Sequence, residues 1–203
     1  MPTDGYLEPM TTREEQLDRL RQGTTFAEDA GITVKDEPAP LFQLLVLSLL
    51  LSARISSGIA VDAARELFRA GYRTPQRMRD ATWQQRVDAL GRGHYRRYDE
   101  RTSTQLGDMA RLVLDEHHGD LRRIRSDDAR EVERALQQVK GIGPAGAAIF
   151  CREVQGVWTE LAPYVDDLAA DGAEQLGLPR TLDGVRTADL PRVVAGCVRA
   201  RLS

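Results

Sequence analysis

The sequence predicts an all-α fold. Apolar residues recur at three- and four-residue spacing through most of the 203 residues, which is the period of amphipathic helices. No alternating run of apolar and polar residues is long enough for a strand. Threonine, glycine and proline stand where such helices would begin and end. The length suits one domain, or two closely packed lobes, with a substantial core.

The helices are expected in chain order at residues 13–21, 41–53, 57–70, 74–80, 82–90, 103–116, 127–139, 144–154, 166–176 and 187–201. Thr12 and Glu15 form the pattern of a capping box for the first helix. Residues 41–53 are apolar on every side, which predicts a central, buried helix. We expect residues 24–40 to form a connecting loop and Met1–Met10 to be a frayed end.

Two glycines and a proline separate two of these helices, in the sequence Gly141-Ile142-Gly143-Pro144. Inside a helix each glycine would cost about 1 kcal/mol and the proline about 3 kcal/mol. At a junction they fit, because glycine permits positive φ and proline suits the first helical turn. The second helix of such a helix–hairpin–helix begins with free N–H groups that suit a phosphate. We therefore predict a DNA-backbone site made of Lys140, Gly141, Ile142, Gly143, Ala145 and Gly146.

Four sequence blocks carry a resemblance, and they cover roughly residues 38–178. They are residues 40–54, ending in Leu-Ser-Ala-Arg; Ala89-Leu90-Gly91; the hairpin with its preceding Val139-Lys140; and Val165-Asp166, with Asp166 eleven positions before Gly177. In this order they resemble the endonuclease III-like DNA glycosylases, the helix-hairpin-helix superfamily known as HhH-GPD.

The resemblance implies a two-lobed helical glycosylase fold with a cleft. Residues 41–150 would form a barrel lobe that ends in the helix-hairpin-helix, and residues 11–40 and 151–203 would form the second lobe. It also implies that Asp166 is the catalytic carboxylate, which stabilises positive charge on the sugar as the N-glycosidic bond breaks. Asp166 also precedes an expected helix, and aspartate is a good N-cap, so a purely structural role stays open.

The sequence departs from that family at two places. Bifunctional members carry a lysine where this chain has Ala145, so the imine route to strand cleavage is closed there. Cys151 and Cys197 lack iron–sulfur ligand spacing, and we expect buried thiols and no cluster. The expected activity is that of a monofunctional base-excision glycosylase in DNA repair. The alternatives are a catalytically silent module that recognises distorted DNA, and a helical protein-interaction domain whose hairpin amides are covered by protein.

A second DNA-contacting region is expected around residues 91–101. By resemblance, the side chains that enter the duplex as a wedge or fill the gap left by a flipped base are Arg54, Arg92, His94 and Tyr95, while Arg96 and Arg97 would hold phosphates. Asp99 and Glu100 favour a different interpretation, a salt-bridged surface loop. Arg54 could equally form an ion pair at the end of its helix.

The net charge of −3 provides no overall basic field, so any attraction to DNA must be local. The expected partner is double-stranded DNA, bound by a monomer. We expect no cofactor and no side-chain metal site; a monovalent cation at the hairpin would be held by backbone carbonyls. No signal peptide is recognisable and the longest apolar run is too short to span a membrane, which predicts a cytoplasmic, nucleoid-associated protein.

Overall fold

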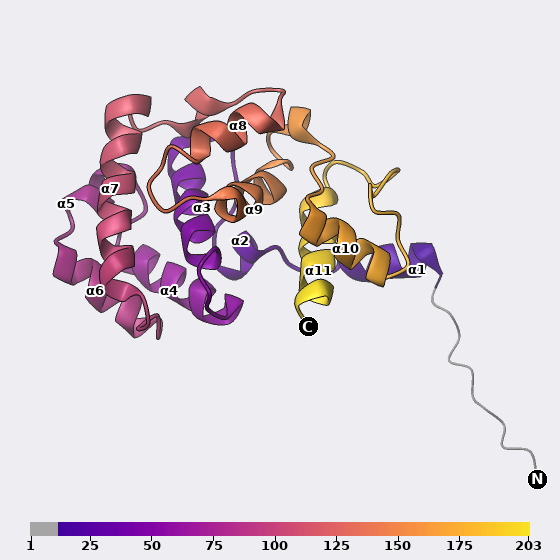
Figure 1. Cartoon of the computed structure of the whole chain (residues 1–203), viewed down its shortest axis with the longest axis horizontal. Helices are drawn as coiled ribbons and strands as arrows, with labels where there is room; N and C mark the ends of the chain where they lie inside the picture. Colours follow the sequence, from indigo (N-terminus) through magenta and orange to yellow (C-terminus); the bar gives the residue numbers. More distant parts are fainter. Residues whose placement is uncertain (1–11) are drawn as a thin grey trace, which may run out of the picture.

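The computed structural model describes residues 12–203, and this part of the chain is helical and contains no strand (Figure 1). The all-α prediction is confirmed. The α-helices are α1 (Arg13–Arg21), α2 (Phe26–Asp29), α3 (Pro38–Leu51), α4 (Ser57–Arg69), α5 (Pro75–Asp80), α6 (Trp83–Arg92), α7 (Asp99–His117), α8 (Ala129–Leu136), α9 (Pro144–Val154), α10 (Asp167–Gln175) and α11 (Leu190–Leu202). Two short 3-10 helices lie at Leu121–Ile124 and Thr159–Leu161.

Most helix ends lie within a few residues of the predicted ones. Thr12 and Glu15 form the expected capping box, and α9 has the predicted bounds. The predicted loop 24–40 was wrong in part, because α2 lies within it and α3 already begins at Pro38. Thr25 and Glu28 form a second capping box that nucleates α2. The expected frayed end, Met1–Met10, lies outside the described residues.

Two apolar clusters hold the helices together. The large cluster is built around α3, whose residues are buried on every side, and includes side chains from α2, α4 to α9 and the segment up to Leu161. The small cluster joins α1, α10 and α11 with Leu178 and Leu182. Helices α10 and α11 cross so closely that a Cβ atom on Gly172 would lie 1.9 Å from the carbonyl oxygen of Cys197.

The small cluster lies at one end of the molecule, beside α9 (Figure 1). The two clusters follow the predicted lobes only in part. Ala27, Trp158 and Leu161 fall outside residues 41–150, yet they are buried in the large cluster. Phe26 packs against both clusters. The boundaries of the two lobes therefore stay a prediction. Within residues 12–203 we find no helix that combines the length and apolar character of a membrane span.

Candidate active site and nucleic-acid interface

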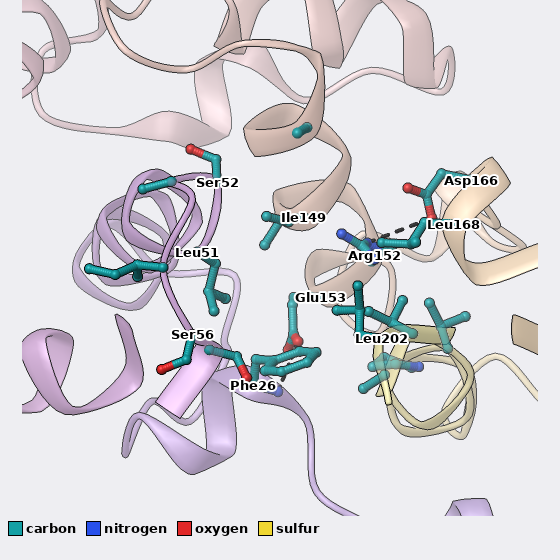
Figure 2. Close-up of a pocket in the computed structure, with 18 residues that line it drawn as sticks. Phe26, Leu51, Ser52, Ser56, Ile149, Arg152, Glu153, Asp166, Leu168 and Leu202 are labelled. Atoms are coloured by element: carbon teal, nitrogen blue, oxygen red, sulfur yellow. Dashed lines mark hydrogen bonds and ion pairs between the residues drawn. The ribbon is translucent and has the colours of Figure 1, made fainter. Parts of the chain in front are cut away.

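A cavity of about 580 Å³ opens where the two clusters meet, and Figure 2 shows its lining. One wall is α9, with Ala145, Ile149, Arg152 and Glu153; α3 and the loop after it form another. Asp166 and Leu168 contribute from the start of α10. The remaining lining is mostly apolar, with Phe26, Leu51, Ala53, Ile55, Pro191, Val194, Ala195, Val198 and Leu202. The volume lies in the range of small-molecule pockets.

Asp166 is held at the cavity wall by the helix it caps. It is the N-cap of α10, and its Oδ1 atom accepts a hydrogen bond of 3.3 Å from the amide of Ala169. The same Oδ1 atom lies 3.7 Å from Nε of Arg152. Asp167 is exposed and does not line the cavity. The predicted capping interaction is therefore present, and Asp166 is the aspartate of this pair that faces the cavity.

The loop before Asp166 is fixed by buried polar groups. The carboxylate of Glu133 on α8 accepts a hydrogen bond from the Tyr164 hydroxyl. Burial, together with this neighbouring carboxylate, raises the pKa of Tyr164 above its ordinary value. Gln155, which is fully buried at the end of α9, binds the backbone of Tyr164. Both helices of the hairpin pair thus hold the segment that carries Asp166.

Two charged residues of the cavity were not predicted. Arg152 and Glu153 lie on α9, seven and eight residues after Ala145. The cavity face of the helix contains residues 145, 149, 152 and 153, which is the i, i+4, i+7, i+8 spacing of one helical stripe. That spacing is visible in the sequence and would have identified both. Burial raises the pKa of Glu153 to about 7, although its carboxylate accepts hydrogen bonds from the amides of Phe26 at 3.0 Å and Ala27 at 3.4 Å.

The hairpin adopts the predicted geometry. Gly141 has φ +100, which favours glycine, and Gly143 is the N-cap of α9 with Pro144 in its first turn. The amides of Gly143 and Ala145 find no acceptor within residues 12–203, and Ala145 is exposed. Such amides suit an anion. The neighbouring Lys140 is largely exposed, with Nζ 3.9 Å from Asp108.

Two residues of the predicted backbone site, Ile142 and Gly146, are buried. Ile142 was predicted to offer its amide to DNA, but this N–H donates to the carbonyl of Val139 at 2.9 Å and the side chain is buried. Gly146 is also buried, and a Cβ there would lie 3.3 Å from Ile142. Ile142 anchors the hairpin in the large cluster, and Gly146 makes room for it.

A second, more polar pocket of about 280 Å³ lies beside the hairpin. It brings together three residues predicted separately, Arg54, Tyr95 and Gly141, with Tyr98 and Arg101 of the predicted region 91–101, and it adds Gln105, which was not predicted. Tyr98, Arg101 and Gln105 lie in or beside the first turns of α7, which begins at Asp99 and not at the predicted residue 103. The prediction of Tyr95 as a wedge was wrong, because its side chain is only 1% exposed and belongs to the large cluster.

The other arginines of this region remain open to solvent. Arg54, Arg96, Arg97 and Arg101 are exposed and form no ion pair within residues 12–203, although Arg97 stacks on Tyr98 at 5.2 Å. Arg92 instead lies 3.3 Å from Glu66, and His94 is exposed with φ +62. Arg92 therefore forms a salt bridge with Glu66, in part as expected for a plain surface loop, whereas Asp99, Glu100 and Arg54 form no ion pair among the described residues.

Comparison with known proteins finds similar solved structures, but no matching sequence. No protein-family model and no curated protein sequence matches the chain. Among solved structures, it is similar to an endonuclease III–DNA covalent intermediate, trapped with an estranged adenine, and to a non-covalent endonuclease III–DNA complex. Each match has a TM-score of 0.57 and 14% identity, and covers 91% of this chain and 80% of the other. The chain therefore has the helical fold of endonuclease III.

Proposed function

We propose that this protein is a monofunctional DNA glycosylase that cleaves the N-glycosidic bond of a damaged or mismatched base in duplex DNA. The observation that carries the proposal is the shared cavity of Ala145 and Asp166. It places the start of the hairpin's second helix and a carboxylate on the walls of one pocket. The likeness to DNA-bound endonuclease III supports the same reading.

The parts of the site have complementary roles in this proposal. The free amides at Gly143 and Ala145 bind a phosphate, while Arg54, Arg96, Arg97 and Arg101 provide local positive charge. The target base leaves the stack and enters the cavity. The glycosidic bond breaks with its electron pair on the base, and Asp166 stabilises the positive charge on the sugar. Water then bonds to C1′ and loses a proton.

Because position 145 is an alanine, the proposed enzyme should not cleave the DNA strand. An amine at that position could attack C1′ and form an imine, but a methyl group cannot. The product would be an intact abasic strand, and no cofactor takes part in these steps.

The decisive test is base release by Asp166→Asn from a panel of lesion-bearing duplexes. Asparagine keeps the shape and much of the capping interaction but removes the charge that acts in the transition state. We expect normal folding, at least wild-type affinity for the duplex, and a loss of release on the order of 100-fold or more. Asp167→Asn is the matched control and should keep the wild-type rate. Wild-type release by both variants, or none by the wild type, would favour the silent DNA-binding module.

A further inference from the structure

Arg152 and Asp166 meet where the two clusters adjoin. Arg152 lies on α9, which belongs to the large cluster, whereas Asp166 caps α10, which belongs to the small one. Nε of Arg152 lies 3.7 Å from Oδ1 of Asp166, and a dashed line marks this contact in Figure 2. The two side chains are 11% and 21% exposed, so solvent screens their attraction less than it screens an exposed ion pair.

The guanidinium group of Arg152 is itself anchored to α9. Its Nε atom donates a hydrogen bond of 3.4 Å to the carbonyl oxygen of Ala148, one turn earlier. Nε is the only nitrogen of the group that donates a hydrogen bond within residues 12–203. The side chain therefore has a defined place on the cavity wall, which it shares with Ile149. A carboxylate in contact with this group is held at a set distance from α9, the helix that begins at the hairpin.

The contacts of Asp166 distinguish its two carboxylate oxygens. Oδ1 accepts the hydrogen bond from the Ala169 amide and faces Arg152, whereas Oδ2 accepts no hydrogen bond within residues 12–203. The Cβ–Cγ torsion of an aspartate has broad minima, so one hydrogen bond of 3.3 Å leaves the carboxylate considerable freedom to rotate. A second contact at the same oxygen restricts that rotation, and it leaves Oδ2 without a competing partner.

We propose that Arg152 is a positioning residue for Asp166, which holds Oδ1 so that Oδ2 meets the sugar as the glycosidic bond breaks. This inference rests on the proposed function. Electrostatic stabilisation is strongest when the stabilising group is oriented before charge develops. A carboxylate that rotates, or that moves with the small cluster, would lose part of the effect, because small displacements of a reacting group are costly. Arg152 acts through Asp166 and does not itself contact the substrate.

The test is a double-mutant cycle of Arg152→Met and Asp166→Asn, measured as single-turnover base release from one lesion duplex. Arg152→Met alone should lower the rate by on the order of 10-fold or more and keep duplex affinity within a few-fold of wild type. In the Asp166→Asn background the same change should leave the remaining rate unaltered, because no charged carboxylate is left to position. Arg152→Lys restores a positive charge beside Oδ1 and should recover part of the rate.

Arg180→Met is the matched control. Arg180 pairs with Asp171 and Glu174 of α10 and does not line the cavity, so its loss should leave the rate at the wild-type value. An equal loss from Arg152→Met in both backgrounds would assign Arg152 to DNA contact or to stability. A faster Arg152→Met would mean that the guanidinium charge weakens Asp166. Either result would overturn the inference and leave the proposed function intact, whereas a wild type that releases no base would overturn both.

Discussion

The side-chain amide of Gln155 binds both backbone polar groups of Tyr164. Its Oε1 atom accepts from the Tyr164 amide at 2.9 Å, and its Nε2 atom donates to the Tyr164 carbonyl at 3.1 Å. Nε2 also donates to the carbonyl of Arg152 at 2.9 Å. Gln155 is 0% exposed, so these bonds form away from water. They tie the segment two residues before Asp166 to the helix that carries Arg152.

This contact predicts a positioning role for Gln155. Gln155→Met has similar length but cannot form the three hydrogen bonds, so the loop should move and Asp166 should lose its geometry. We expect duplex binding within a few-fold of wild type and a reduction in single-turnover base release on the order of 10-fold or more, because small displacements of a reacting group are costly. Rate and affinity are measured on one lesion duplex.

A control variant is needed to separate a lower rate caused by the moved loop from one caused by lower stability. Val113→Ala removes buried methyl groups from α7, away from the cavity, and serves as the control for a comparably weakened fold. It should release base at the wild-type rate at a temperature where both variants are folded. A rate for Gln155→Met that equals this control would assign Gln155 a structural role only.

Gly143 allows the charge at the hairpin to be changed without changing its shape. Its φ of −96 is open to any residue, and a Cβ would meet nothing within 4 Å. Asparagine and aspartate are both good N-caps, so each should preserve α9. Gly143→Asp places a negative charge at the proposed phosphate site and should weaken binding to any duplex by on the order of 10-fold, independently of sequence. Gly143→Asn is the neutral control.

Fluorescence anisotropy with duplexes of several sequences measures this effect. Equal affinities of the aspartate and asparagine variants would remove the hairpin from the DNA interface. Gly141→Ala provides a contrast, since φ +100 strains any side chain and the new Cβ would lie 2.5 Å from Nε2 of Gln105. That variant should lose thermal stability, by roughly 1–2 kcal/mol from the left-handed backbone alone.

Local sequence signals predicted the helices well and the orientation of loop side chains less well. Capping residues and proline marked the ends of α1 and α9, because these signals act within one turn. Helix α2 was missed since four residues are too few to show a period. Tyr95 was misassigned because its burial depends on tertiary packing within the large cluster, which no local pattern encodes. The helical spacing of α9 could have predicted that Arg152 faces the cavity. It could not have predicted which of its N–H groups lack an acceptor.

The absence of an amine at position 145 predicts the form of the product. Base release by the wild type should leave an intact abasic strand that breaks only after alkali or heat, and borohydride should trap no covalent complex. Ala145→Lys places an amine on the cavity wall that contains Asp166, and we expect it to gain detectable trapping. Denaturing gels of labelled duplexes report both products. Efficient trapping of the wild type would mean that another amine, such as Lys140, acts as nucleophile.

The buried carboxyl of Glu153 predicts a pH dependence of stability. Its pKa rises from 4.5 to about 7 on folding, chiefly because burial disfavours the charged form. The native state therefore binds more protons than the unfolded state between these values, and the contribution to stability falls as pH rises through this window. Glu153→Gln keeps the shape and an acceptor for the Phe26 amide but cannot ionise.

We measure the free energy of unfolding by denaturant titration of wild type and Glu153→Gln from pH 4 to about pH 9. The difference between the two proteins should change by on the order of 2 kcal/mol across the window, in the direction that disfavours the wild type at higher pH, and should be flat above about pH 8. The lowered pKa of His117 acts with the opposite sign near the same pH. His117 is present in both proteins, so the difference removes its contribution. A difference that does not vary with pH would mean that Glu153 stays ionised in the native state, held by the amides of α2.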